Sequence, residues 1–178
     1  MPSTAFAPHS PDADAAVTLA QRQLRIGVEH YSAGRTEEAI SAFQLGLASV
    51  GNEAPDAVPV EIVSELHAKL GNAWMIRGDL ESAGESYKAA LRLAPHLTDC
   101  WSNFGNVHLK TGRPQDAITL YLQALKLNGS HWPARTNLVH ALMATQQYII
   151  ARALLLELTG NARKTASFTI SSARSALS

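Results

Sequence analysis

The segment KLGNAWMIRGDL begins at Lys69, and a similar segment, NFGNVHLKTGRP, begins at Asn103. A related segment begins at Arg25 and another at Asn137, and the last three copies start at equal intervals. A motif that recurs every ~20–50 residues is typical of small structural units that bury their apolar faces by stacking on one another. The repeat therefore indicates a stacked-repeat architecture before any other feature is considered.

Small and large side chains recur at fixed places within the copies. Glycine holds two positions in the first three copies, alanine holds a third position in all four, and a large side chain lies one helical turn after each alanine. A large side chain opposite a small one lets two helices pack closely. The three sets of small residues are Gly27, Gly71 and Gly105, then Gly34, Gly78 and Gly112, then Ala39, Ala83, Ala117 and Ala151, and the large residues are Phe43, Tyr87, Tyr121 and Leu155.

Between the glycines, apolar residues recur every three or four positions, which is the period of an α-helix. The second glycine of each copy suits the left-handed conformation that ends a helix. Acidic residues, and Pro114 in the third copy, follow where the next helix would begin. Strand alternation is nowhere sustained, so we expect an all-α protein with helices at 12–33, 36–49, 60–77, 80–93, 98–110, 114–127, 131–145 and 147–159.

The repeats predict one domain over residues 12–160, with copies at about 20–51, 64–97, 98–131 and 132–160. The first interval is longer than the others, and the extra residues fall in GNEAPDAVPV, a connection with Gly and Pro that lengthens one turn. Residues 1–11 are expected to form a flexible lead. Residues 161–178 are rich in Ser and poor in large apolar side chains, so they are expected to be a disordered or weakly helical tail.

Composition excludes several classes of function. Lys plus Arg equals Asp plus Glu at 15 each, without the basic excess usual in a protein that binds nucleic acid. Cys100 is the only cysteine, which rules out an intramolecular disulfide and a zinc site built from several thiolates. No apolar run reaches the roughly 18 residues of a membrane helix, and the first residues lack a secretory signal pattern. We expect a cytoplasmic protein without membrane insertion.

Catalytic motifs are also missing from the sequence. The seven histidines form no His-x-x-x-His pair, and neither a Gly-x-Ser-x-Gly elbow nor a phosphate-binding glycine loop occurs. His30 and His108 share one place in the repeat, which is typical of a packing position. Trp74, Trp101 and Trp132 lie near repeat starts or helix interfaces and are predicted to be core residues. We therefore expect no enzyme activity, no cofactor and no metal.

The repeat resembles the tetratricopeptide repeat, a helix–turn–helix unit of about 34 residues with small residues at set places. The resemblance covers about residues 20–158, and GNAW…GDLESAGESYKAALRLAP is similar to repeats of the O-linked N-acetylglucosamine transferase type. It implies a right-handed α-solenoid of about four units, acting as a non-enzymatic adaptor that binds an extended partner segment on a concave face. The third copy matches best, at Trp101, Phe104, Gly105, Ala117, Tyr121 and Ala124.

In this family the concave wall carries the residues two before and one after the first glycine position. Asparagine fills four of these places, and an exposed carboxamide can bind the backbone of a peptide whatever its sequence. Asparagine beside glycine also occurs for packing and solubility alone, so that alternative stays open. The predicted partner-binding residues are Lys69, Asn72, Asn103, Asn106, Asn137, Arg25 and His140, with Val28 in the remaining place.

Some co-chaperones of this family hold an acidic C-terminal tail in a carboxylate clamp. Asn72 and Asn103 match the two asparagines of that clamp, but Ala68, Pro133 and Asn137 stand where it needs basic residues. Without those cations a terminal carboxylate loses its charge-assisted hydrogen bonds, so the clamp is not expected.

Two other functions are compatible with the repeat: a docking or regulatory arm of a glycosyltransferase, and a self-assembling scaffold. The fourth copy has Val139 and Gln146 in place of the two glycines, and its second helix, IIARALLLEL, is apolar on nearly every face. Since a solenoid normally ends in a polar capping helix, we expect this face to be covered by another subunit, by a partner or by the tail.

Overall fold

The computed structural model describes residues 11–50 and 58–158, and within them it contains eight α-helices and no strand. Every helix end lies within one residue of its predicted place, so the all-α prediction is confirmed for this part of the chain. The helices are α1 (Pro11–Ser32), α2 (Thr36–Ala48), α3 (Val60–Arg77), α4 (Leu80–Leu93), α5 (Thr98–Lys110), α6 (Pro114–Leu127), α7 (Trp132–Ala144) and α8 (Tyr148–Leu158).

The predicted tail (161–178), nearly all of the predicted lead (1–11) and most of the insertion in GNEAPDAVPV lie outside the described residues. The division of the chain into lead, repeat domain and tail therefore stays a prediction.

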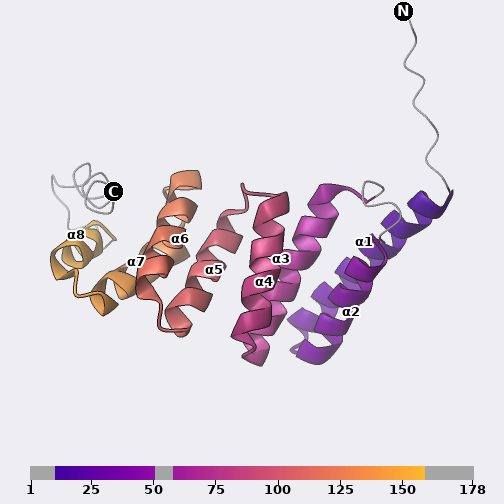
Figure 1. Ribbon diagram of the computed structural model, residues 1–178, viewed down its shortest axis with the longest axis horizontal. Coiled ribbons are helices and arrows are strands. Elements are labelled where there is room, and N and C mark those ends of the chain that lie inside the picture. Colours follow the sequence, from indigo (N-terminus) through magenta and orange to yellow (C-terminus); the bar gives the residue numbers. More distant parts are fainter. Residues whose placement is uncertain (1–10, 51–57, 159–178) are drawn as a thin grey trace, which may run out of the picture. The chain divides into compact units, whose positions relative to one another are not determined.

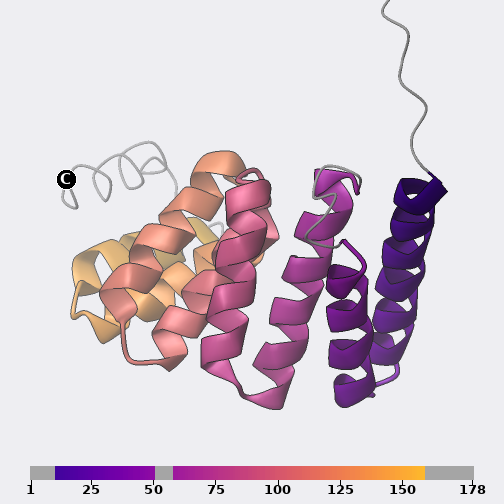
Figure 2. The same cartoon turned by 45° about the vertical axis from the view of Figure 1, so that its right-hand side comes forward.

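The helices form two compact units, one within Met1–Pro95 and one within His96–Ser178. In the first unit α1 packs on α2, α2 on α3 and α3 on α4, and α1 also touches α3. The second unit has the same order, with α5 touching α7. Each unit is thus two antiparallel helix pairs whose first helices lie side by side, as the ribbons of Figures 1 and 2 show.

The helix ends follow the local signals in the sequence. Gly34, Gly78 and Gly112 end the first helices with φ of 74°, 89° and 74°, and Gln146 takes the same turn in the fourth copy with φ of 61°. The Asp79 carboxylate accepts a hydrogen bond of 3.0 Å from the Ser82 amide and so caps α4. The predicted role of the second glycine is confirmed.

In the first three copies, the first glycine marks the place where an aromatic ring from the second helix lies against the first helix. A Cβ added at Gly105 would lie 2.5 Å from the Tyr121 ring, so only glycine leaves room for that ring. The other copies repeat the contact, and all three rings are at most 1% exposed. The corresponding distances are 2.3 Å from Gly27 to Phe43 and 2.7 Å from Gly71 to Tyr87.

One of the three predicted core tryptophans is on the surface. Trp132 is 59% exposed, because it is the first residue of α7 and the buried stripe of that helix begins at Ala134. Trp101 packs against the core of the second unit as predicted. Trp74 is half-buried, and the Arg77 guanidinium lies 4.9 Å from its ring centroid. The prediction for Trp132 is wrong.

We predict that Gly105→Ala destabilises the fold by about 1–3 kcal/mol, because the added methyl group overlaps the Tyr121 ring. Gly129→Ala is the matched control, since a Cβ there would have its nearest neighbour at 3.8 Å. Urea denaturation followed by circular dichroism measures both free energies of unfolding. Equal stability of the two variants would contradict the claim that Gly105 is needed to leave room for the Tyr121 ring.

Candidate functional site

The predicted partner-binding residues lie on the first helices of the pairs. Arg25 is on α1, Lys69 and Asn72 on α3, Asn103 and Asn106 on α5, and Asn137 and His140 on α7. Arg25 and His140 are exposed, and the other five side chains are half-buried.

In the second unit, three predicted asparagines come together across α5 and α7. The Asn137 Nδ2 donates a hydrogen bond of 2.8 Å to the Asn106 Oδ1. The Asn106 Nδ2 lies 3.5 Å from the Asn103 Oδ1. We call these three residues the carboxamide cluster. It joins two neighbouring first helices, α5 and α7, through polar side chains.

In the first unit, the predicted cations each have an acidic neighbour one turn away. Arg25 Nη1 lies 2.9 Å from Glu29 Oε1, and Lys69 Nζ lies 3.9 Å from Glu65 Oε1. Both pairs are solvent-exposed, so each adds only a few tenths of a kcal/mol to stability.

Two asparagines have a structural partner that the sequence analysis did not identify. The Tyr87 hydroxyl donates to Asn72 Oδ1 at 2.7 Å, and the Tyr121 hydroxyl donates to Asn106 Oδ1 at 2.8 Å. Burial raises the pKa of Tyr121, so the hydroxyl stays protonated and acts as a donor.

The sequence did contain a sign of these two hydrogen bonds, because each tyrosine follows its asparagine at the same separation along the chain. Tyr87 and Tyr121 lie equally far along the chain from their asparagines, and Phe43, which has no hydroxyl, is preceded at that spacing by Val28. Leu155 in the fourth copy is likewise preceded by His140 rather than asparagine. The asparagine thus accompanies the hydroxyl that needs an acceptor.

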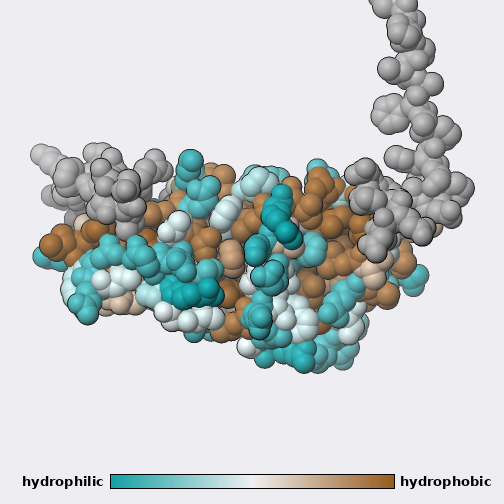
Figure 3. Space-filling model, in the orientation of Figure 1, coloured by the Kyte–Doolittle hydropathy of each residue, from teal (hydrophilic) through white to brown (hydrophobic). Residues whose placement is uncertain are grey.

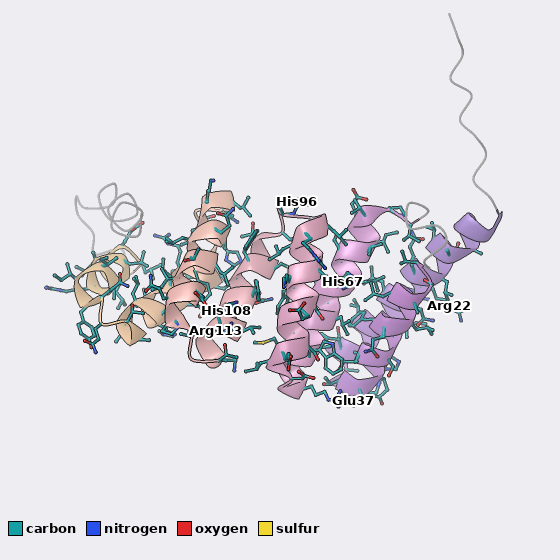
Figure 4. The ribbon with its side chains drawn as sticks, viewed as in Figure 1. Arg22, Glu37, His67, His96, His108 and Arg113 are labelled. Atoms are coloured by element: carbon teal, nitrogen blue, oxygen red, sulfur yellow. The ribbon has the colours of Figure 1, made fainter. Side chains whose placement is uncertain are left out.

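Two partly buried histidines, His108 and His67, have a lowered pKa, and burial is the main cause for both. Burial lowers the pKa of His108, the nearby Arg113 lowers it further, and Asp116, whose Oδ2 lies 3.3 Å from His108 Nδ1, opposes them. Figure 4 shows His108 and Arg113 close together, where α5 turns toward α6. The ring also meets Phe104 edge-on, with centroids 4.8 Å apart, as expected of a packing position.

His67, also labelled in Figure 4, has its pKa lowered by burial and then by the charge of Arg92. His30, which shares the repeat position of His108, is half-buried and accepts a hydrogen bond of 2.8 Å from Arg35 Nε.

Within residues 11–50 and 58–158, no group of three or more His, Cys, Asp or Glu side chains is placed to hold a metal ion. None of the helices in these ranges has the length and apolar character needed to cross a membrane.

Two family models, both described as tetratricopeptide repeat, match residues 24–97 and 108–169. The chain belongs to the tetratricopeptide repeat (TPR) family. The resemblance in the sequence, from the glycine positions to the paired helices, is confirmed.

Three proteins show what this TPR chain is similar to. It is 33% identical over 104 residues to outer dynein arm-docking complex subunit 4 of Danio rerio, covering 54% of this chain and 21% of that protein, so it spans about a fifth of that relative. The O-GlcNAc transferase of Thermobaculum terrenum, in a K341M mutant structure, superposes with a TM-score of 0.61 at 25% identity, over 76% of this chain and 23% of that one. The first TPR of Spaghetti (RPAP3), bound to the HSP90 peptide SRMEEVD, superposes with a TM-score of 0.64 at 19% identity, over 73% of this chain and 95% of that one.

We predict that the Tyr121 hydroxyl and the Asn106 carboxamide stabilise the fold as a pair. Tyr121→Phe should cost about 0.5–1.5 kcal/mol, and Asn106→Val about 1–3 kcal/mol, because it leaves the tyrosine hydroxyl without its acceptor. The double variant recreates the Val28–Phe43 combination of the first copy, so its cost should be smaller than the sum of the two. Urea denaturation of all four proteins measures the coupling, and strict additivity would contradict it.

We also predict a stability that falls as the pH is lowered from about 7.5 to about 5.5. Burial lowers the pKa of His67 and of His108 in the folded chain, so as the pH falls through the range in which histidine titrates, the unfolded chain binds more protons than the folded one. Asp79, whose pKa is lowered mainly by its hydrogen bonds from Ser82, loses its contribution only at lower pH. His67→Gln and His108→Gln should each flatten the dependence of the unfolding free energy on pH, and an unchanged slope in both would refute the assignment.

Proposed function

We propose that this TPR chain is a non-enzymatic interaction adaptor that binds an extended segment of a partner protein along the first helices within a unit. In the second unit the contact residues are Asn103, Asn137 and His140, and in the first unit they are Arg25 and Lys69. Asn72 and Asn106 hold the tyrosine hydroxyls and shape the same surface.

The carboxamide cluster is the observation that carries this proposal. Among the described residues, Asn137 makes one side-chain hydrogen bond, through a single amide hydrogen. Its carbonyl oxygen and second amide hydrogen can therefore pair with the N–H and C=O groups of a bound peptide. Each such bond contributes about 0.5–1.5 kcal/mol net, so several are needed for useful affinity.

Asn106 has a different task from Asn137. Its Oδ1 accepts from both the Tyr121 hydroxyl and the Asn137 amide, so both lone pairs of that oxygen are used. Asn106 thereby orients the Asn137 carboxamide for a ligand. His140, one helical turn after Asn137 and exposed, extends the same polar surface.

The TPR family membership and the peptide bound to the first TPR of Spaghetti support a peptide ligand, since that chain shares this fold. The side chains indicate an internal segment of the partner rather than its C-terminus. Ala68, Pro133 and Asn137 leave the clamp positions without a cation, so a terminal carboxylate gains no charge-assisted bond there.

We predict that Asn137→Ala weakens peptide binding by about 2–12-fold, which corresponds to one lost hydrogen bond. The probe is a C-terminally amidated peptide selected by display against the full chain, and calorimetry measures its affinity. Gln115→Ala is the matched control, because it removes an exposed carboxamide from α6, a second helix.

Equal affinities of the wild type and Asn137→Ala would remove the carboxamide argument. The peptide SRMEEVD with a free C-terminus is the contrasting probe, and we expect it to bind more weakly than the selected peptide. A higher affinity for SRMEEVD would show that the chain reads a terminal carboxylate after all.

A docking or regulatory arm of a glycosyltransferase is the second candidate. The 25% identity with the Thermobaculum terrenum O-GlcNAc transferase over 76% of this chain favours it. The native gene distinguishes the two functions, since an arm of this kind is followed by a large α/β catalytic region in the same chain or is copurified with one.

A further inference from the structure

The last helix of the described residues, α8, presents large apolar side chains to solvent. Tyr148, Ile149, Leu155 and Leu156 are 60%, 87%, 43% and 41% exposed. All but Ile149 line a shallow hollow with Met143, Ala151 and Arg152, and we call these seven residues the α8 face. Hydrophobic atoms show as brown at the left-hand edge of Figure 3, where Figure 1 places α8. A clustered apolar surface of this kind marks an interaction site.

Two other copies, the first and the third, show what covers such a face there, whereas the second copy has Gly84 at that position. Ile40 on α2 and Ile118 on α6 are 3% and 0% exposed, and each belongs to a core shared with the next first helix, α3 or α7. Arg152 holds the same repeat position on α8, one repeat after Ile118, and is exposed. The α8 face therefore has the shape of a helix-binding surface with a cation in place of a buried isoleucine.

The cation restricts what can bind. Among the residues that the structure describes, Arg152 has no ion pair with an acidic side chain. A helix that covers the α8 face removes water from the guanidinium, which is unfavourable unless a carboxylate accompanies it. The favoured occupant is thus an amphipathic helix with an acidic residue within or beside its apolar stripe.

A second copy of this chain does not meet that requirement. The only acidic residue of α8 is Glu157, which is already paired with Arg135 of α7. Two α8 faces packed together would bring two Arg152 side chains into one contact. Stacking α8 on α1 of another copy would bury Arg22, which stands on α1 at the repeat position of the buried Leu66 and Ala134.

The segment that follows α8 is also a poor match in charge. Residues 159–178 contain Arg163, Lys164 and Arg174 and have no Asp or Glu. No side chain of this segment can therefore neutralise Arg152, and its own cations would repel it.

We propose that the α8 face is a second docking surface, distinct from the first-helix surface, which binds an amphipathic helix of another protein through apolar contacts and a carboxylate opposite Arg152. The acidic residue gives selectivity, because a helix with a cation at that place is repelled.

The test uses three synthetic helical peptides of four to five turns with a Leu/Ala stripe that differ only in one residue at the stripe border, which is Glu, Gln or Lys. Fluorescence anisotropy with the full chain should show the Glu peptide binding at least about tenfold more tightly than the Lys peptide. Arg152→Glu should reverse that order, and the control Lys126→Glu, a charge reversal at an exposed position of α6, should leave it unchanged. Failure of all three peptides to bind, or an order that Arg152→Glu does not change, overturns the proposal.

The other occupants are tested on the full chain. Sedimentation velocity should show a monomer for the wild type and concentration-dependent association for Arg152→Ile, which restores the isoleucine of the third copy. A wild-type oligomer that Arg152→Glu alters would identify a second copy as the occupant and overturn the proposal. A variant with both Phe168→Ser and Ile170→Ser tests residues 159–178 as the occupant. If this variant binds the Glu peptide more tightly than the wild type does, the chain's own residues compete for the α8 face, and the proposal is overturned.

Discussion

The contact of an aromatic ring with a glycine sets the distance between the two helices of a pair, and other features follow from it. Because Gly71 and Gly105 leave room for the Tyr87 and Tyr121 rings, those rings are buried against the first helix. A buried tyrosine carries its hydroxyl into the structure, where it needs an acceptor. Asparagine on the first helix supplies that acceptor in both copies. Packing thereby places carboxamides on the first helices.

This origin changes how the asparagines are understood. The four carboxamides looked alike in the sequence, as equivalent contacts for a partner. In the structure Asn72 and Asn106 satisfy hydroxyls from the second helices, while Asn137 is held by Asn106 and keeps hydrogen-bonding capacity of its own. One residue type thus serves packing at one position and, in the proposed function, binding at another. A binding experiment must separate the packing role from the binding role. Substitution of Asn137 allows this, because no tyrosine hydroxyl donates a hydrogen bond to Asn137 in the described structure.

The helices could be predicted from the sequence because their ends depend on local chemistry: Gly34, Gly78 and Gly112 allow the left-handed turn that ends the first helices. Side-chain partners between helices depend on packing that periodicity does not reveal. The spacing identified Asn106 and Tyr121 separately but not the bond between them, although the Val28–Phe43 combination offered the clue. The exposure of Trp132 was missed for the same reason, since the repeat gives its position but not which side of the helix is covered.

The fourth copy shows how several changes at one place in a repeat are related. Val139 takes the glycine position and Leu155 takes the aromatic position. The side chain on the first helix is therefore larger than in the other copies, and the side chain on the second helix is smaller. Leu155 has no hydroxyl, and no asparagine is then required, which leaves His140 exposed. On α8, Arg152 holds the repeat position of the buried isoleucine Ile118, and it lines the same hollow as the apolar Leu155 and Leu156. A fully polar face would have prevented stacking altogether, whereas an apolar face with one cation admits only helices that supply the opposite charge.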